Sequence, residues 1–239
     1  MSKVMLVASG KGGTGKTFFT ANAGALLAMR GYKVVLIDMD MGLRNLDLYL
    51  GMENRVVYNV MDVLSGMCKI SQALIKDRRF KSLYLIAASP ARDERDITPL
   101  HLKVLCEKLC ERFDYVIIDA PAGIGDGLEL AAAGADTAAV ITEAEFAAVR
   151  DADVVDRSLE KLGVEKRYCV INKVDAELMA MGAVPGISSV SRSMRMDIAG
   201  IIQDDDNIRI ATNRGLPIVM KQGTYIEKNF SKITDRLLE

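Results

Sequence analysis

A glycine-rich loop near the start of the chain places the strongest constraint on the fold. Residues 9–18 read SGKGGTGKTF, and Gly10, Gly15, Lys16 and Thr17 fit the phosphate-loop pattern G-x-x-x-x-G-K-[ST]. An apolar run at 4–8 comes before this loop, and helix-forming residues follow it. Because the motif requires a strand, a loop and a helix in this order, the sequence predicts a phosphate-binding site on an α/β fold.

Each residue type in the loop has a mechanical role in holding phosphate. Glycines let backbone N–H groups turn inward towards an anion, and the following helix directs its positive end at the same point. Lys16 would reach the outer phosphates, and the Thr17 hydroxyl would ligate Mg²⁺. The pattern does not require the second lysine, Lys11. We expect nucleotide contacts along the whole loop, from Gly10, Lys11, Gly12, Gly13, Thr14, Gly15, Lys16, Thr17 and Phe18.

Further apolar runs predict a parallel sheet. They lie at 34–37, 83–87, 115–118, 138–141, 168–171 and 198–202. Helix-like segments such as 99–112 and 147–162 lie between most of these runs. Continuous apolar strands that alternate with amphipathic helices indicate an α/β fold with a doubly wound, mostly parallel sheet and helices on both faces. Since no linker or charge block divides the 239 residues, we expect one domain, 1–239.

Polar residues suited to a nucleotide follow three of the expected strands. They are Asp38 and Asp40, Asp119 with Gly123 behind it, and Asn172 with Lys173. Ligands gather at the carboxyl ends of parallel strands, so these residues should lie beside the phosphate loop. Asp119 suits a Mg²⁺ site, and the segment ending at Gly123 can present a backbone N–H to a γ-phosphate. The alternative is that each aspartate only caps a helix.

Composition argues against several other classes of protein. Lysine and arginine total 31 against 32 acidic residues, so a broad nucleic-acid-binding surface is not expected. No stretch approaches the roughly 18 apolar residues of a membrane span, which favours a cytoplasmic protein. The cysteines form no C-x-x-C pair, and packed thiols are favoured over a metal site. A single histidine, His101, leaves little material for a His-dependent triad.

The loop and several other stretches resemble the deviant Walker A ATPases, the family that includes ParA and MinD proteins. The loop of that family reads KGGxGKT, as residues 11–17 do here. The similarity is closer to the MinD group and runs through essentially the whole chain. It includes residues 38–60, 72–79, 84–96, 119–124 and 147–153. Within these stretches, GLRNLD and ALIKD are far more specific than the loop alone.

The resemblance implies an ATPase switch that dimerises on ATP and helps to position the division septum by recruiting regulators of the MinC and MinE type. It implies ATP and Mg²⁺ as cofactors. Lys11 would be the signature lysine that reaches the partner's nucleotide in the dimer, much like an arginine finger supplied in trans. Lys11, Lys16 and Asp40 would form the catalytic set, with Asp40 assigned to the attacking water.

Further site roles follow from the same resemblance. Asp38 and Asp119 would join Thr17 around Mg²⁺ and its water shell. Asn172 would hold adenine, because an amide can pair with its N6/N7 edge. Asn45 would lie in a switch segment near the dimer face.

The chain departs from the family pattern at three positions. Phe18 stands where a threonine or serine is usual, so a hydroxyl contact to the inner phosphate is lost. Gly125 replaces an acidic residue common in the MinD group, which affects the coupling of the switch segment. Gln203 replaces a usual proline and changes one wall of the expected base pocket.

Three alternatives stay open from the sequence. Residues 172–175 read NKVD and fit the N-K-x-D pattern that reads guanine, although the wider resemblance favours ATP, with Asp175 starting a helix. A ParA-like DNA-partitioning ATPase is disfavoured by the near-neutral charge. A biosynthetic enzyme of the superfamily would need a substrate domain, or a cysteine after the Asp119 motif.

The final segment bears on membrane association. MinD proteins dock on the inner face of the cell membrane through a C-terminal amphipathic helix. In this chain Ile226, Phe230, Ile233 and Leu237 recur at helical spacing, and the charges between them are of mixed sign. We expect a helix packed on the domain rather than a lipid anchor, and therefore weak membrane binding by this chain.

Overall fold

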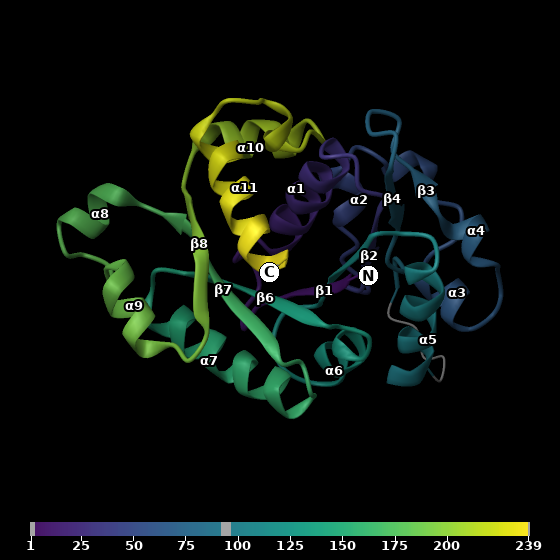
Figure 1. Ribbon diagram of the computed structural model, residues 1–239, viewed down its shortest axis with the longest axis horizontal. Helices are drawn as coiled ribbons and strands as arrows, with labels where there is room; N and C mark the ends of the chain where they lie inside the picture. The colour runs from purple at the N-terminus through teal and green to yellow at the C-terminus, as the bar shows by residue number, and fades with distance from the viewer. Residues whose placement is uncertain (1–2, 92–96, 239) are drawn as a thin grey trace.

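An eight-stranded sheet forms the centre of the computed structural model, which describes residues 3–91 and 97–238 (Figure 1). The strand order is β3-β4-β2-β5-β1-β6-β7-β8, and neighbours are parallel except β3, which runs antiparallel to β4. The strands are Lys3–Ala8 (β1), Val34–Asp38 (β2), Ile75–Lys76 (β3), Leu83–Ile86 (β4), Tyr115–Asp119 (β5), Thr137–Glu143 (β6), Lys166–Val174 (β7) and Asp197–Gln203 (β8).

Helices cover both faces of this sheet. They are Lys16–Met29 (α1), Leu46–Tyr49 (α2), Val60–Leu64 (α3), Ile70–Ala73 (α4), Pro99–Cys110 (α5), Asp126–Ala132 (α6), Phe146–Lys161 (α7), Ala176–Ala180 (α8), Ile187–Ser193 (α9), Asp206–Asn213 (α10) and Tyr225–Leu238 (α11), with 3-10 turns at Glu53–Arg55 (η1) and Ile218–Met220 (η2). In Figure 1, α1, α10 and α11 lie on one face, and α5, α6 and α7 lie on the other. The predicted doubly wound α/β fold is confirmed.

The alternation of side chains along β1 divides the core into two layers. Val4, Leu6 and Ala8 pack in one layer, and Met5 and Val7 pack in the other. Because both faces are covered, the strand reads as one continuous apolar run in the sequence.

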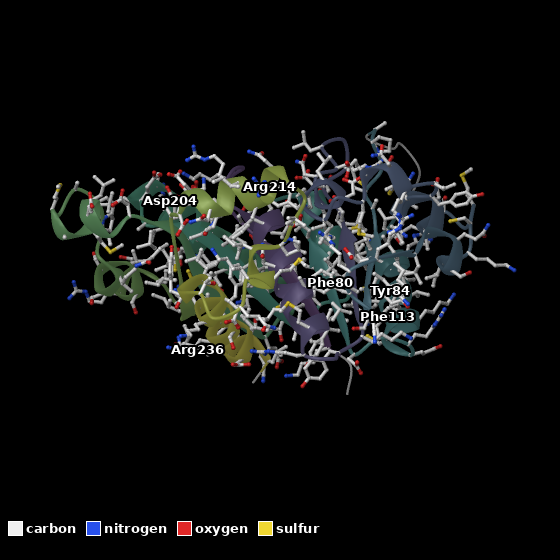
Figure 2. All side chains as sticks on the ribbon, turned by 90° about the horizontal axis from the view of Figure 1, so that it is seen from above. Phe80, Tyr84, Phe113, Asp204, Arg214 and Arg236 are labelled. Carbon is white, nitrogen blue, oxygen red and sulfur yellow. The ribbon has the colours of Figure 1, made fainter. Side chains whose placement is uncertain are left out.

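Small residues let α1 approach the sheet closely. A Cβ atom added to Gly24 would lie 2.6 Å from Leu36 Cδ2. At the far edge of the sheet, larger side chains fill the space: Tyr84 and Phe113 pack edge to face with ring centroids 5.3 Å apart (Figure 2). Because Gly24 has no side chain, α1, the helix that follows the phosphate loop, packs directly against the strands.

The register of the strands brings their carboxyl ends to one edge. Lys3 to Val7 of β1 pair in sequence with Tyr115 to Asp119 of β5. Asp38 at the end of β2 is in register with Asp119 at the end of β5. The polar residues that follow the predicted strands are thus gathered around the loop that leaves β1.

The structure extends the sequence-based strands and adds one. β1, β2, β5, β6, β7 and β8 each include one or more residues beyond the predicted apolar run, and β4 ends one residue earlier. β3 was not predicted, since a two-residue edge strand has no periodicity to detect. Of the stretch 84–96, residues 92–96 lie outside the described part of the chain.

The cysteines and the histidine take the structural places expected of them. Cys106 and Cys169 are buried thiols of the core, and burial raises the pKa of each to about 12. His101 lies exposed in the first turn of α5, where its Nδ1 accepts a hydrogen bond from the Thr98 backbone N–H at 3.0 Å. Thiols of this kind are packing residues rather than nucleophiles.

The last helix packs its apolar stripe inward, as predicted. Ile226, Phe230, Ile233 and Leu237 are all buried in α11. Phe230 contacts both Phe18 and Phe19 of α1, with each pair of ring centroids 5.6 Å apart. Within residues 3–91 and 97–238, no helix has the length and apolar character needed to cross a bilayer.

Candidate nucleotide-binding site

The backbone of the phosphate loop depends on glycine at two positions. Gly13 and Gly15 have φ angles of 82° and 99°, a region that side chains disfavour. A Cβ atom added to Gly15 would also lie 2.2 Å from Asn172 Nδ2. Lys16 is the first residue of α1 and is buried, with 6 % of its surface exposed. The loop therefore closes tightly over the positive end of α1, as an anion site requires.

The three predicted metal ligands meet beside the loop. The Thr17 hydroxyl donates to Asp119 Oδ2 at 2.7 Å, and the Thr20 hydroxyl donates to Asp119 Oδ1 at 3.1 Å. Asp38 accepts hydrogen bonds from the backbone N–H groups of Asp40, at 2.9 Å, and Leu46, at 3.1 Å. Thr20 was not predicted, although its position three residues after Thr17 on a helix was a usable signal.

The two aspartates of this cluster are buried and carry the same charge. Burial raises the pKa of Asp38, and the neighbouring Asp119 charge raises it further. Burial also raises the pKa of Asp119, while the Thr17 hydrogen bond and the Lys16 charge act in the opposite direction. Two buried carboxyl groups this close resist ionising together, and a cation bound beside them would favour the ionised form of both.

These residues fit Mg²⁺ and a phosphate chain. Carboxylate and hydroxyl oxygens are ligands that Mg²⁺ accepts, usually with waters and phosphate oxygens completing the shell. The Thr14 hydroxyl oxygen is buried and has no hydrogen-bond partner among the described residues. A bound phosphate would supply that partner, since orphaned buried polar atoms are rare in proteins.

Asn172 and Lys173 contact the loop itself. The Asn172 amide donates to the Thr14 carbonyl at 2.8 Å. Lys173, in a left-handed conformation with φ of 51°, donates from Nζ to the Gly13 carbonyl at 2.7 Å. Both predicted residues therefore brace the backbone of the phosphate loop from β7.

Lys11 points away from the buried cluster. Its Nζ lies 3.0 Å from Glu145 Oε2 and 3.4 Å from Glu143 Oε2, and the Glu145 hydrogen bond raises the pKa of Lys11. Glu143 also pairs with Lys173 at 2.9 Å. Neither glutamate was predicted as part of the site. Glu143 ends a strand beside the loop in the same way as Asp119, but the apolar run at 138–141 stops two residues before it.

A cavity of about 440 Å³ opens beside the loop on the side of Asn172. Gly13 and Gly15 form its loop end, and Tyr49 of α2 and several residues of α10 form its walls. Gln203 and Phe18, two of the departures from the family pattern, both line it. Asp204, labelled in Figure 2, lies in the same lining. Its size and position suit the base and ribose of a nucleotide.

A second cavity, of about 690 Å³, lies at the other side of the site. Asp40 and Gly123 line it together, so the structure brings the predicted water-orienting carboxylate and the predicted γ-phosphate segment to one opening. Gly125, with φ of 144°, precedes α6 in the same lining. Asn45 lies at the start of α2, next to this region in the chain.

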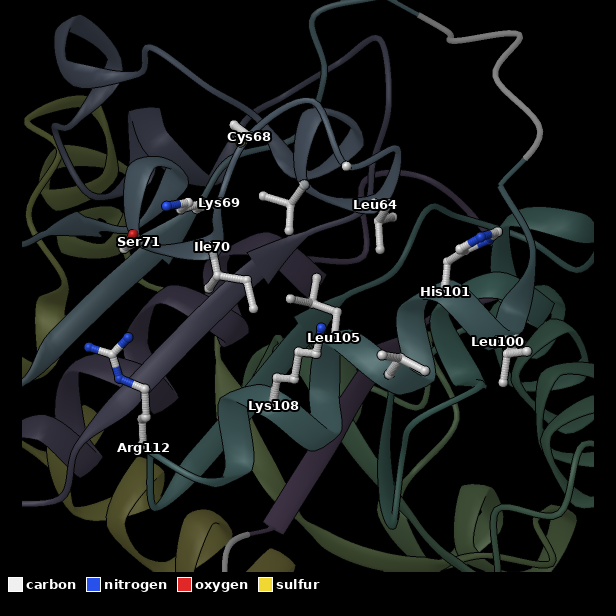
Figure 3. A pocket seen from close by; sticks show the side chains of 13 residues that line it. Leu64, Cys68, Lys69, Ile70, Ser71, Leu100, His101, Leu105, Lys108 and Arg112 are labelled. Atoms are coloured by element: carbon white, nitrogen blue, oxygen red, sulfur yellow. The ribbon is translucent and has the colours of Figure 1, made fainter.

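A third cavity, of about 630 Å³, is remote from the predicted residues. It lies between α3, α4 and α5, where Leu64, Ile70 and Leu105 form an apolar floor (Figure 3). None of the predicted site residues lines it. It therefore plays no part in the candidate site.

The arrangement of loop, buried lysine and paired aspartates on a parallel sheet defines a P-loop nucleotide-binding protein. A family model described as the CobQ/CobB/MinD/ParA nucleotide binding domain matches residues 5–218. The septum site-determining protein MinD of Bacillus subtilis (strain 168) is 42 % identical over 240 residues, which cover 100 % of this chain and 90 % of that protein. The chain therefore belongs to the MinD family of cell-division proteins.

Solved structures agree with this assignment. A MinD chain of the MinC:MinD cell division protein complex from Aquifex aeolicus matches with a TM-score of 0.91 and 36 % identity, covering 99 % of this chain and 96 % of that one. MinD from Pyrococcus horikoshii OT3, complexed with Mg-ADP, matches with a TM-score of 0.88 and 28 % identity, with the same two coverages. The resemblance inferred from the sequence is confirmed.

Proposed function

We propose that this chain is a Mg²⁺-dependent ATP hydrolase of the MinD type, which dimerises when ATP is bound and recruits division regulators. The observation that carries the proposal is the cluster of Thr17, Asp38 and Asp119 beside the buried Lys16. This cluster combines a phosphate cradle with carboxylate and hydroxyl oxygens of the kind that Mg²⁺ accepts.

Each residue of the site then has a chemical task. The loop backbone and Lys16 hold the β- and γ-phosphates and stabilise the charge that develops on them. Thr17, Asp38 and Asp119 would hold Mg²⁺, directly or through water, and the ion would supply positive charge against the phosphates. Asp40 orients the attacking water from the 690 Å³ cavity, and the backbone at Gly123 meets the γ-phosphate. That segment follows the phosphate when it leaves, so hydrolysis changes its conformation.

Lys11 couples dimerisation to ATP in this proposal. Its present partners, Glu143 and Glu145, belong to its own chain, and both the lysine and Glu145 are substantially exposed. The exposed Lys11–Glu145 pair is worth about 0–1 kcal/mol, so its exchange for the partner's phosphate costs little. A second cation over the transferring phosphate stabilises the transition state in the dimer alone.

ATP is proposed over GTP because the guanine-reading aspartate has another task. Asp175 Oδ1 accepts hydrogen bonds from the backbone N–H groups of Glu177, at 2.9 Å, and Leu178, at 3.0 Å. It therefore caps α8, as one reading of the sequence expected. Competition calorimetry tests this point, and tighter binding of GDP than of ADP would overturn it.

Regulators of the MinC and MinE type are the proposed partners, by kinship with the MinD chain that was solved in a MinC:MinD complex. We place the protein in the cytoplasm, with peripheral association at the inner face of the membrane. The apolar stripe of α11 is buried and is not the membrane contact, so the present chain should pellet weakly with anionic vesicles. Nucleic acid is not a proposed partner, given the net charge of −1.

The decisive experiment measures ATP turnover and mass together. Light scattering with a slowly hydrolysed ATP analogue should give a dimer, and the same sample with ADP should give a monomer. Turnover should require Mg²⁺ and should rise when an activator protein is added. A chain that binds ATP but stays monomeric would refute the switch.

A further inference from the structure

Residues 72–79, which read QALIKDRR, belong to the stretches that resemble the MinD group, yet the catalytic proposal gives them no task. Two of them form a fixed pair. Asp77 is buried, with 3 % of its surface exposed, and Arg79 donates to both of its oxygens, from Nε at 3.1 Å and from Nη2 at 2.7 Å. The Arg79 backbone N–H donates to Asp77 as well, at 2.7 Å. Asp77 therefore fixes the plane of the guanidinium.

The rest of the guanidinium reaches two carbonyl groups from distant parts of the chain. Arg79 Nη2 donates to the Leu50 carbonyl at 2.6 Å, and Nη1 donates to the Gly215 carbonyl at 2.7 Å. Leu50 caps the end of α2, and Gly215 follows α10 by two residues. One side chain thus ties the ends of two helices that are separated by more than 150 positions in the chain.

The two tied segments are already in close backbone contact. A Cβ atom added to Gly215 would lie 2.7 Å from Gly51 Cα. Gly51 and Gly215 have φ angles of 57° and 61°, so both positions favour glycine on conformational grounds too. The spacing between α2 and α10 is set at this point, where Arg79 holds both backbones.

These two helices form opposite walls of the 440 Å³ cavity beside the phosphate loop. Tyr49, the residue before Leu50, enters the lining from α2, and Thr212 and Asn213 enter it from the end of α10. The width of the cavity and the placement of Tyr49 thus depend on where Arg79 holds the ends of α2 and α10.

We propose that Arg79, oriented by Asp77, is a positioning residue that sets the width of the cavity between α2 and α10 and so determines affinity for the nucleoside part of the nucleotide. The inference rests on the proposed nucleotide site and adds a residue that touches no ligand atom. The planar fork is essential, since one group must meet a carboxylate and two carbonyl oxygens in different directions. A lysine, with a single ammonium nitrogen, cannot reproduce that geometry.

The test compares a ligand that fills the cavity with one that does not. Calorimetry with Mg²⁺ measures the binding of ADP and of pyrophosphate to the full chain, which avoids dimerisation and hydrolysis. Arg79→Met should weaken ADP binding by about tenfold, the equivalent of one lost positioning interaction. It should leave pyrophosphate binding unchanged, because the phosphate loop does not depend on Arg79. Arg79→Lys should weaken ADP binding nearly as much as Arg79→Met.

Two further variants control for charge and for folding. Arg78→Met removes the same charge from the exposed neighbouring position and should leave ADP affinity at the wild-type value. Asp77→Asn keeps the shape of the buried side chain and should give a smaller loss of ADP affinity than Arg79→Met. Intact pyrophosphate binding reports that each variant has folded around a working loop.

The outcomes separate this inference from the proposed function. If Arg79→Met binds ADP like the wild type, or loses ADP and pyrophosphate binding to the same degree, Arg79 does not position the cavity and the inference is overturned. If the wild-type chain binds neither ligand, the proposed nucleotide site fails and this inference fails with it. Loss of ADP affinity alone, in both Arg79 variants but not in Arg78→Met, supports it.

Discussion

The two ends of the phosphate loop are built in opposite ways. At its C-terminal end, Lys16 is buried, and the adjacent Thr17 hydroxyl donates a hydrogen bond to the buried Asp119. At its N-terminal end, the Lys11 side chain is 36 % exposed and forms an ion pair with the Glu145 side chain, which is 56 % exposed. The loop at 9–18 therefore has a fixed end, at the buried Lys16, and an open end, at the exposed Lys11.

The difference shows that Lys16 is held in place by the fold, whereas Lys11 can exchange its partners. Buried charges and hydrogen bonds act in a medium of low effective dielectric, so breaking them is expensive. Exposed ion pairs are screened by water and salt, and their partners are easily exchanged. A loop built in this way can hold nucleotide with one lysine and signal its presence with the other.

The largest effect is expected at the fixed end. Lys16→Ala should abolish nucleotide binding, because it removes the buried cation proposed to hold the outer phosphates and the positive charge that opposes Asp119. Calorimetry with ADP and Mg²⁺ measures the loss, and thermal unfolding shows whether the fold survives. ADP binding within a few-fold of the wild type would remove the distinction between the two ends.

At the open end, binding and output should separate. Lys11→Ala should leave ATP binding by the monomer largely intact and remove ATP-dependent dimerisation and hydrolysis. The reason is that the Lys11 side chain pairs with the half-buried Glu143 and the exposed Glu145 of its own chain, so its loss leaves the buried Lys16 end of the loop unchanged. Light scattering with a slowly hydrolysed ATP analogue and a turnover assay check this. Normal dimerisation and turnover in Lys11→Ala would contradict the signature role.

A third change tests whether α7 packs tightly against the N-terminal end of the loop. Gly10→Ala should destabilise the fold by about 1–3 kcal/mol, the range for overpacking, because its Cβ would lie 2.5 Å from Asp151 Cβ and 2.7 Å from the Asp151 backbone carbon. Gly12→Ala is the matched control, since an added Cβ there meets nothing within 4 Å. Chemical denaturation of both variants gives the comparison. Equal stabilities would mean that α7 does not confine the loop.

The smallest effect is expected from changing Glu145, the exposed ion-pair partner of Lys11. Glu145→Gln should strengthen ATP-dependent dimerisation by about twofold to fivefold, the size of one exposed ion pair, without changing ATP affinity of the monomer. It should also lower the pKa of Lys11, because the Glu145 hydrogen bond is what raises it most. The dimer dissociation constant from analytical ultracentrifugation is the measurement. Weaker dimerisation would show that Glu145 supports the dimer instead of competing with it.

Residues that act through strand ends were readable from the sequence. Asp38 and Asp119 each close an apolar run, and the rule that parallel strands end at one edge was enough to place them together with Thr17. Glu143 obeys the same rule, but the run at 138–141 hid the last two residues of β6. The fold was predictable for the same reason, since seven of its described strands contain continuous apolar runs.

Contacts to backbone carbonyl groups were not readable. Arg79 meets the carbonyls of Leu50 and Gly215, and a carbonyl group is common to every residue, so nothing in the sequence marks these as its partners. Asn172 presents the same difficulty, because its amide bonds to the Thr14 carbonyl and not to a recognisable side chain. Sequence patterns locate side chains that converge on a ligand more readily than side chains that hold the chain to itself.

The pairing of β1 has a consequence for the order in which the protein is made. β1 lies between β5 and β6, so the strand that carries the loop finds its neighbours only after Tyr115 and Thr137 have been synthesised. The brace from Asn172 arrives later still. Pairings over such sequence distances form slowly, and an unpaired apolar strand is prone to aggregation meanwhile. The phosphate loop is thus synthesised long before the strands that support it, and it becomes functional only after they have joined the sheet.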